Sequence, residues 1–304
     1  MKIKDNRIPA LIRFAMAITV LNLAGHLFLG FEQSFVHMLV AMGTAYTLEI
    51  LFETLSAKIE QRASAYVGGF KKVIVFLLPC HISALAVSML LFTNVQLMPI
   101  VFGTAVAVLS KVIFKVNING RMRHFLNPSN TGIAMCFLLF PWVGTAPPYQ
   151  FSENVTGAGD WILIAIFVLL GSFLNARFTK KIPLINAWLI GFFLQAIIRT
   201  SIFSTATIAA LVPMTGVAFL LFTFYMISDP STTPMKTKNQ IMFGAGVALV
   251  YGCLMSLHMV FGLFFSLLIV CTLRGSYFWV TNIIAKEKPV SNLTIKEFIE
   301  PVSA

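Results

Sequence analysis

Long apolar stretches separated by short polar segments dominate the chain. Each is close to the roughly 20 residues that an α-helix needs to cross about 30 Å of hydrocarbon. The pattern predicts ten membrane-spanning helices, near residues 8–30, 36–55, 73–94, 96–116, 127–143, 161–177, 183–203, 207–227, 240–258 and 260–281. The last two share one apolar run that is too long for a single crossing, so a turn is expected between Ser256 and Gly262. We therefore expect an all-α, polytopic integral membrane protein.

Basic residues occupy alternate connections between these spans. One side receives Lys2, Lys4, Arg7, Lys58, Arg62, Lys71, Lys72, Lys115, Arg121, Arg123, Arg177, Lys180, Lys181, Lys236, Lys238, Lys286, Lys288 and Lys296. The opposite side receives only Arg199. Under the positive-inside rule this alternation predicts a plasma (inner) membrane protein with both termini in the cytoplasm. Arg13, Lys111 and Arg274 lie inside spans near their cytoplasmic ends, and their side chains are expected to reach the headgroups.

The longest outer connection runs from Pro141 to Asp160 and contains no basic residue. Trp142 and Trp161 flank it, as aromatic residues do at a membrane surface. Residues 1–285 are expected to form a single transmembrane domain, and residues 286–304 a cytoplasmic polar tail.

Composition narrows the class of protein further. The chain is 58% hydrophobic and 11% charged, which excludes an ordinary soluble domain. Its formal net charge of +11 would point to nucleic acid in a soluble protein, but the basic residues follow the loops, so the expected partner is the lipid bilayer and not nucleic acid. The four cysteines lie in apolar segments without CxxC spacing, so neither a disulfide framework nor a zinc site is indicated. No metal site and no catalytic residues are predicted elsewhere in the chain.

Two segments on the predicted cytoplasmic side look alike: Asn127-Pro128-Ser129 before one span and Asp229-Pro230-Ser231-Thr232 before another. Asn or Asp followed by Pro is typical of a capped helix start, whose positive dipole end favours anions. The pair is interpreted either as two ordinary caps or as helix ends that line a site for an anionic or polar ligand. The second interpretation predicts a cofactor-binding site; its candidate residues are Arg121, Arg123, His124, Asn127, Ser129, Asp229 and Thr232.

Few other polar residues lie inside the spans. Glu49 and Glu53 are one helical turn apart near the inner end of the second span, where interfacial solvation accounts for them. Gln195 and Arg199 form a polar stripe that suits either a hydrogen bond to a neighbouring helix or a solute pathway. His81, next to Pro79, is expected to make a hydrogen bond beside a helix kink.

Several motifs together resemble those of a known family. The segments Arg123–Asn130, Val155–Asp160 and Met226–Pro230 resemble the NqrB/RnfD family, whose members belong to the sodium-translocating NADH:quinone oxidoreductase and to the Rnf electron-transport complex. Phe140-Pro141-Trp142 and Pro213–Gly216 are similar to the UnbU-like branch of that family, found in enediyne biosynthesis clusters. The resemblance implies a membrane electron-transport subunit that works with other membrane or biosynthetic subunits and is at most part of an oxidoreductase, not an enzyme alone.

The resemblance also identifies an outer loop that carries FMN on a threonine hydroxyl in the redox subunits. Thr156, Gly157 and Ala158 match that loop, but the acceptor position is Gly159, which has no hydroxyl. No covalent FMN is therefore expected, whereas non-covalent flavin or quinone binding is compatible with the sequence. Two other functions are also compatible: a permease for a small organic molecule, which the repeated helix starts favour, and a membrane scaffold for biosynthetic enzymes.

Overall fold

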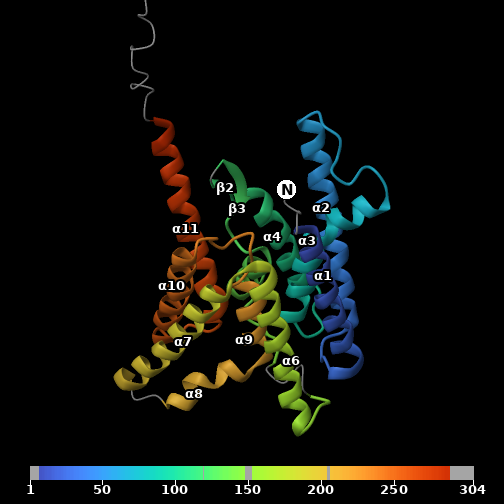
Figure 1. Cartoon of the computed structure of the whole chain (residues 1–304). Helices are drawn as coiled ribbons and strands as arrows, with labels where there is room; N and C mark the ends of the chain where they lie inside the picture. The colour runs from blue at the N-terminus through green and yellow to red at the C-terminus, as the bar shows by residue number, and fades with distance from the viewer. Residues whose placement is uncertain (1–6, 119, 148–152, 204–205, 288–304) are drawn as a thin grey trace, which may run out of the picture.

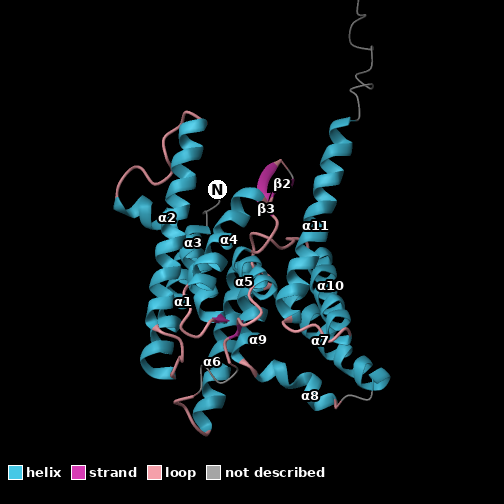
Figure 2. Ribbon diagram, turned by 180° about the vertical axis from the view of Figure 1, so that it is seen from behind, coloured by secondary structure: helices cyan, strands magenta, loops and turns pink. Residues whose placement is uncertain are grey.

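The computed structural model describes residues 7–118, 120–147, 153–203 and 206–287. Helices α1 to α4 gather on one side of the molecule and α7, α10 and α11 on the other, with α5, α6 and α9 between them (Figures 1 and 2). The all-α class is confirmed, and two very short antiparallel ribbons are added to it.

The helices are α1 (Arg7–Ala24), α2 (Phe35–Ile59), α3 (Phe70–Leu90), α4 (Met98–Ile113), α5 (Pro128–Leu139), α6 (Ala158–Leu174), α7 (Ile182–Phe203), α8 (Thr207–Leu211), α9 (Val217–Leu221), α10 (Thr237–Ser256) and α11 (Gly262–Glu287). Three helices continue into π-helical turns, η1 (Gly25–Leu29), η2 (Asn175–Thr179) and η4 (Phe222–Met226), and a 3₁₀ turn, η3 (Val212–Thr215), follows α8. Strand β1 (Leu91–Phe92) pairs with β4 (Gly144–Thr145), and β2 (Lys115–Ile118) pairs with β3 (Arg121–His124).

The number of membrane spans differs from the predicted ten. Seven helices of the described residues are long and apolar enough to cross a bilayer. The segments Thr207–Thr215 and Val217–Met226 would make an eighth span, broken by a bend of 68°. The chain is thus a multi-span membrane protein, and the turn expected between Ser256 and Gly262 is present.

The two predicted spans at 96–116 and 127–143 are wrong. Helix α4 has 16 residues and α5 has 12, which gives lengths of about 24 Å and 18 Å at 1.5 Å per residue. Helix α5 ends early because Phe140 precedes Pro141, and proline disfavours the helical conformation of the residue before it. The end of the other apolar run forms strand β2 instead of helix, because it pairs with β3.

Helix α5 lies against α4 at very short range. A side-chain Cβ on Gly132 would lie 2.1 Å from the backbone oxygen of Gly103. Only glycine permits this approach, because any Cβ there would collide with backbone. The contact places the start of α5 in the interior, where residues Asn127 to Ala134 are all buried.

The basic connections gather at one end of the molecule. Figure 1 shows the β2–β3 hairpin and the last turns of α2 and α11 at one end, and α8 and the start of α6 at the other. This grouping agrees with the charge pattern; which end faces the cytoplasm stays a prediction. Of the proposed polar tail, Lys286 and Glu287 belong to α11, and residues 288–304 lie outside the described residues, as do Lys2 and Lys4.

A polar network crosses the first half of the molecule. The two ring nitrogens of His81 contact Thr19 Oγ1 at 2.8 Å and the Tyr46 hydroxyl at 2.6 Å. Pro79 lies inside the same helix. The expected hydrogen bond of His81 beside the proline is thus confirmed, and it joins α1, α2 and α3.

Candidate functional site

The helix start at Asn127 is confirmed. Asn127 has an extended backbone and its side-chain oxygen accepts from the backbone N–H of Asn130 at 3.0 Å, with Pro128 at the first helical position. The hydroxyl of Ser129 donates to the same oxygen at 3.0 Å. The Asn127 side-chain oxygen thus serves donors of its own helix start.

The second helix start is wrong. Helix α10 begins at Thr237, and Asp229 instead closes an isolated turn. Its carboxylate accepts from the backbone N–H of Ser231 at 3.0 Å and from the hydroxyl of Thr232 at 3.1 Å. Pro234 explains the difference, because the residue before a proline avoids the helical region and Thr233 therefore ends the turn.

The two motifs nevertheless meet in the folded chain. The side-chain amide of Asn127 donates to the backbone oxygen of Met226 at 3.0 Å, across 99 positions of sequence. The amide of Asn175 donates to the backbone oxygen of Phe224 at 2.8 Å. Both acceptors belong to the π-helical turn η4, so buried amides from the start of α5 and from η2 satisfy a locally irregular backbone.

Asn130 has an unmatched oxygen at this junction. The side chain is fully buried, and its amide donates to the backbone oxygen of Phe264 in α11 at 2.9 Å. Its Oδ1 atom has no hydrogen-bond partner among the described residues. A buried acceptor without a donor is costly, which makes this atom a candidate contact for a bound group.

Residues 229–236, which follow η4, form what we call the cationic turn. The buried ammonium of Lys181 donates to the backbone oxygen of Pro234 at 2.7 Å, and the guanidinium of Arg274 donates to that of Thr232 at 2.6 Å. Burial lowers the pKa of Lys181 to about 8, with Asp229 opposing the shift and Arg274 and Arg123 adding to it. Two cations from separate parts of the chain thus hold one turn through its carbonyl groups.

The predicted arginines separate in the hairpin. Arg121 pairs with Ile118 next to the hairpin turn and is exposed. Arg123 and His124 lie farther along β3, are half-buried and approach the cationic turn. Burial lowers the pKa of His124, and the nearby Asp229 carboxylate opposes that shift. The residues that share one region of the structure are therefore Arg123, His124, Asn127, Ser129, Asp229 and Thr232, whereas Arg121 lies apart.

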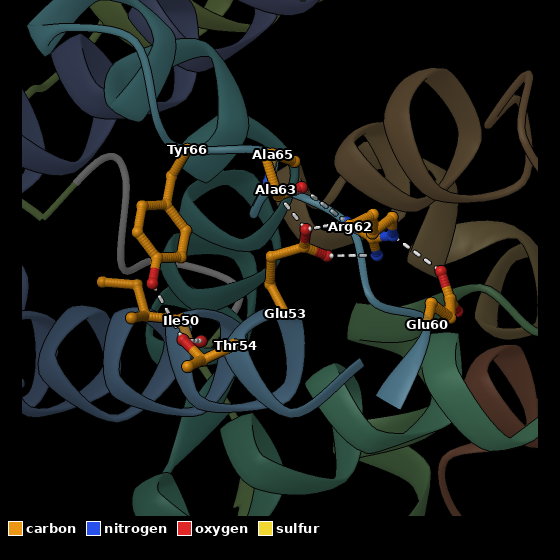
Figure 3. Close-up of polar contacts among 8 residues, drawn as sticks. All are labelled: Ile50, Glu53, Thr54, Glu60, Arg62, Ala63, Ala65 and Tyr66. Atoms are coloured by element: carbon orange, nitrogen blue, oxygen red, sulfur yellow. Dashed lines mark hydrogen bonds and ion pairs between the residues drawn. The ribbon is translucent and has the colours of Figure 1, made fainter. Parts of the chain in front are cut away.

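The two glutamates of α2 have cationic partners. Glu49 accepts from the Lys111 ammonium at 2.7 Å. Glu53 binds the Arg62 guanidinium and accepts from the backbone N–H of Ala65 at 2.7 Å, which folds residues 60–66 back onto the helix (Figure 3). Solvation alone therefore does not account for the glutamates, and Lys111 and Arg274 bind protein groups instead of only reaching headgroups.

The proposed pathway residues bond within their own helix. The Gln195 amide donates to the backbone oxygen of Phe192 at 2.8 Å, and its oxygen accepts from Arg199 at 3.4 Å. Among the described residues, the buried Gln195 thus bonds along α7 and not to a neighbouring helix. A solute pathway along this stripe stays a prediction.

The segment Thr156–Gly159, which the resemblance compares with a flavin-carrying loop, runs into α6. Thr156 precedes Gly157, which has φ of +66°, and the helix begins at Ala158. A Cβ at Gly159 would lie 2.3 Å from Cγ1 of Val155, so a threonine at Gly159 requires Val155 to move. The Val155 side chain therefore occupies the space that a side chain at position 159 would need.

Two cavities are formed by the described residues, and the smaller one borders residues next to His124 and Arg274. One cavity of about 530 Å³ opens between the start of α2 and the loop before α4, and another of about 220 Å³ lies between Phe125 and Trp279. In the described part of the chain, no three His, Cys, Asp or Glu side chains come close enough together to hold a metal ion.

Sequence reasoning missed Lys181, Arg274, Asn175 and Asn130 as members of this region. The first two looked like ordinary cytoplasmic-side charges, and their long side chains conceal which backbone groups they reach. Asn130 belongs to the family-like motif around Pro128. Asn175 is an amide within an otherwise apolar span, and that signal could have identified it.

A scan of the chain against protein-family models finds no match. A search of curated proteins likewise finds no match. The family resemblance thus rests on the motifs alone.

Proposed function

We propose that this protein is a membrane subunit of an electron-transfer system and that it binds a flavin without a covalent bond where α5 meets η4 and α11. The motif resemblance supports the redox class. A flavin would bring electron transfer through its ring system, and the residues of this chain would bind and orient it.

One observation carries the choice of flavin over quinone. Asn130 Oδ1 is a buried acceptor that needs a hydrogen-bond donor. The ring of an oxidised quinone offers only carbonyl acceptors, whereas the flavin ring carries an N–H group between two carbonyls. The Asn130 amide already donates to Phe264, so the residue stays oriented with its oxygen available.

Non-covalent binding follows from the outer loop. The position that would carry the phosphoester bond is Gly159, and no oxygen exists there to form it. A flavin in this protein would therefore leave on denaturation, and Asn130 would act only by hydrogen bonding.

The test is an absorption spectrum of the protein purified in detergent and loaded with FMN or riboflavin. We expect a perturbed flavin spectrum that reverts to that of free flavin on denaturation, and an affinity at least about tenfold lower in Asn130→Leu, from the loss of one buried hydrogen bond. Asn22→Leu is the matched control, because Asn22 Oδ1 is also buried and unpartnered but belongs to α1. Absence of saturable binding, or equal loss in both variants, would refute the proposal.

A permease is the second candidate, and the broken span favours it. The 68° bend between Thr215 and Val217 and the short buried helix α5 are features that transporters use to expose backbone to a solute. Reconstituted vesicles that accumulate an organic solute while the protein shows no flavin binding would favour this function over the first.

A further inference from the structure

Three cations beside the cationic turn, none of them among residues 229–236, outnumber the one carboxylate that acts on Lys181. Arg123, Lys181 and Arg274 interact electrostatically with one another, and Asp229 is the carboxylate that acts on Lys181 with them. In the described part of the chain, none of the three cations lies within ion-pair distance of a carboxylate, since the ion pairs found there are those of Arg62 and Lys111.

Burial makes this excess expensive. The Lys181 side chain is fully buried, and among the described residues its ammonium donates hydrogen bonds to the Pro234 carbonyl and the Met235 sulfur. A buried ammonium that is paired with neutral groups keeps most of its desolvation cost. The carboxylate of Asp229 is already engaged by Ser231 and Thr232. The charge balance of this region therefore favours an added anion.

Donors are left over for such an anion. Arg274 uses Nη1 for the Thr232 carbonyl and lies over the Phe278 ring at 5.1 Å, and its other guanidinium N–H groups make no hydrogen bond to a described residue. The half-buried side chain of Arg123 makes no hydrogen bond to another described residue. Two arginines with open donors suit the oxygens of a phosphate group, which bind guanidinium groups in pairs.

We infer that Arg123 and Arg274, with Lys181 behind them, bind the phosphate group of the ligand. A phosphate monoester carries about −1.5 to −2 charge at pH 7, which matches the excess of two positive charges. The inference rests on the proposed function for the flavin part of the ligand. Given a flavin, the phosphate site identifies it as FMN, because riboflavin has no phosphate group. Phe264 and Arg274 are ten residues apart on α11, about 15 Å along the helix.

The test measures binding to the full chain in nanodiscs of neutral lipid. Inorganic phosphate should raise the unfolding temperature relative to sodium chloride of equal ionic strength, and FMN should bind at least about tenfold more tightly than riboflavin, from its charge-assisted hydrogen bonds. Both effects should vanish in Arg123→Gln and persist in Arg121→Gln, the matched control on the same strand. The backbone pairing of β3 does not use either side chain, so both variants should fold.

Nanodiscs containing phosphatidic acid form the third arm and distinguish a lipid headgroup from a soluble phosphate. Competition by the anionic lipid, abolished in Arg123→Gln, would assign the same chemistry to a lipid source. Equal phosphate effects in Arg123→Gln and the unchanged protein would overturn the inference. Equal binding of FMN and riboflavin without a phosphate effect would also overturn the phosphate inference, and the proposed flavin binding would still stand. A phosphate effect without flavin binding would support the phosphate inference and contradict the proposed flavin binding.

Discussion

Charged side chains near the C-terminal end of α2 and those beside the cationic turn have opposite kinds of partners. At α2 each carboxylate has its own cation, Glu49 with Lys111 and Glu53 with Arg62. At the turn, Lys181 and Arg274 donate to backbone carbonyls and have no carboxylate at ion-pair distance among the described residues. The charges of α2 are neutralised by ion pairs within the chain. The charges beside the turn lack such partners, and the proposed anion would neutralise them. Substitutions in the two regions should therefore differ in the size and the sign of their effects.

Removal of one partner from the most enclosed pair should have the largest effect. Glu49→Leu leaves the Lys111 ammonium, whose side chain is 12% exposed, without its carboxylate. We expect a loss of about 3–4 kcal/mol in the free energy of unfolding, measured by chemical denaturation in detergent. The double variant Glu49→Leu with Lys111→Met should regain most of the loss. A single variant as stable as the unchanged protein would show that the pair contributes nothing.

The buried charge of Lys181 should make the free energy of unfolding depend on pH. Its pKa falls from 10.5 to about 8 in the folded protein, so the unfolded chain binds more protons between these values. Stability should therefore rise, by at most about 3 kcal/mol, as the pH increases from 8 to 10.5. The charged groups that act on Lys181 are the Asp229 carboxylate and the guanidinium groups of Arg274 and Arg123.

The matched variants for this rise are Lys181→Met and Lys180→Met. Lys181→Met should show no such gain, whereas Lys180→Met, at the exposed neighbouring position, should follow the profile of the unchanged protein. A profile of Lys181→Met that equals that of the unchanged protein would contradict the burial of a charged ammonium.

The segment Val155–Gly159 provides a separate test of the proposed non-covalent flavin binding. Gly159→Thr alone should give no covalent flavin, because its Cβ meets Val155. The pair Gly159→Thr with Val155→Ala removes that contact, and co-expression with a flavin transferase should then give a fluorescent band after denaturing electrophoresis. A band from the unchanged protein that disappears in Thr156→Ala would show that Thr156 carries the flavin and that non-covalent binding is wrong.

The smallest effect is expected at the exposed ion pair of α2. Arg62 has 40% side-chain exposure, so water and salt screen its interaction with Glu53. Arg62→Gln should lower the free energy of unfolding only slightly and increase amide exchange mainly in residues 60–66. A loss as large as that in Glu49→Leu would remove the distinction between enclosed and exposed pairs.

The sequence was sufficient for the membrane class, for seven of the spans and for the cap at Asn127. Apolar length and side-chain capping are local properties, so they can be interpreted without the fold. It was insufficient for the number of spans, because the 127–143 run looked continuous although Pro141 ends α5. It also could not show that Lys181 and Arg274 reach one turn from separate parts of the chain, since long-range contacts of flexible side chains leave no periodic signal.

The central claim is that the chain binds one flavin mononucleotide without a covalent bond. Native mass spectrometry after loading with FMN and removal of the excess tests this most directly, with a second spectrum taken after denaturation. The account predicts an added mass of one FMN in the native spectrum and the bare chain in the denatured one. The bare chain in both spectra, or an added mass that survives denaturation, would contradict it.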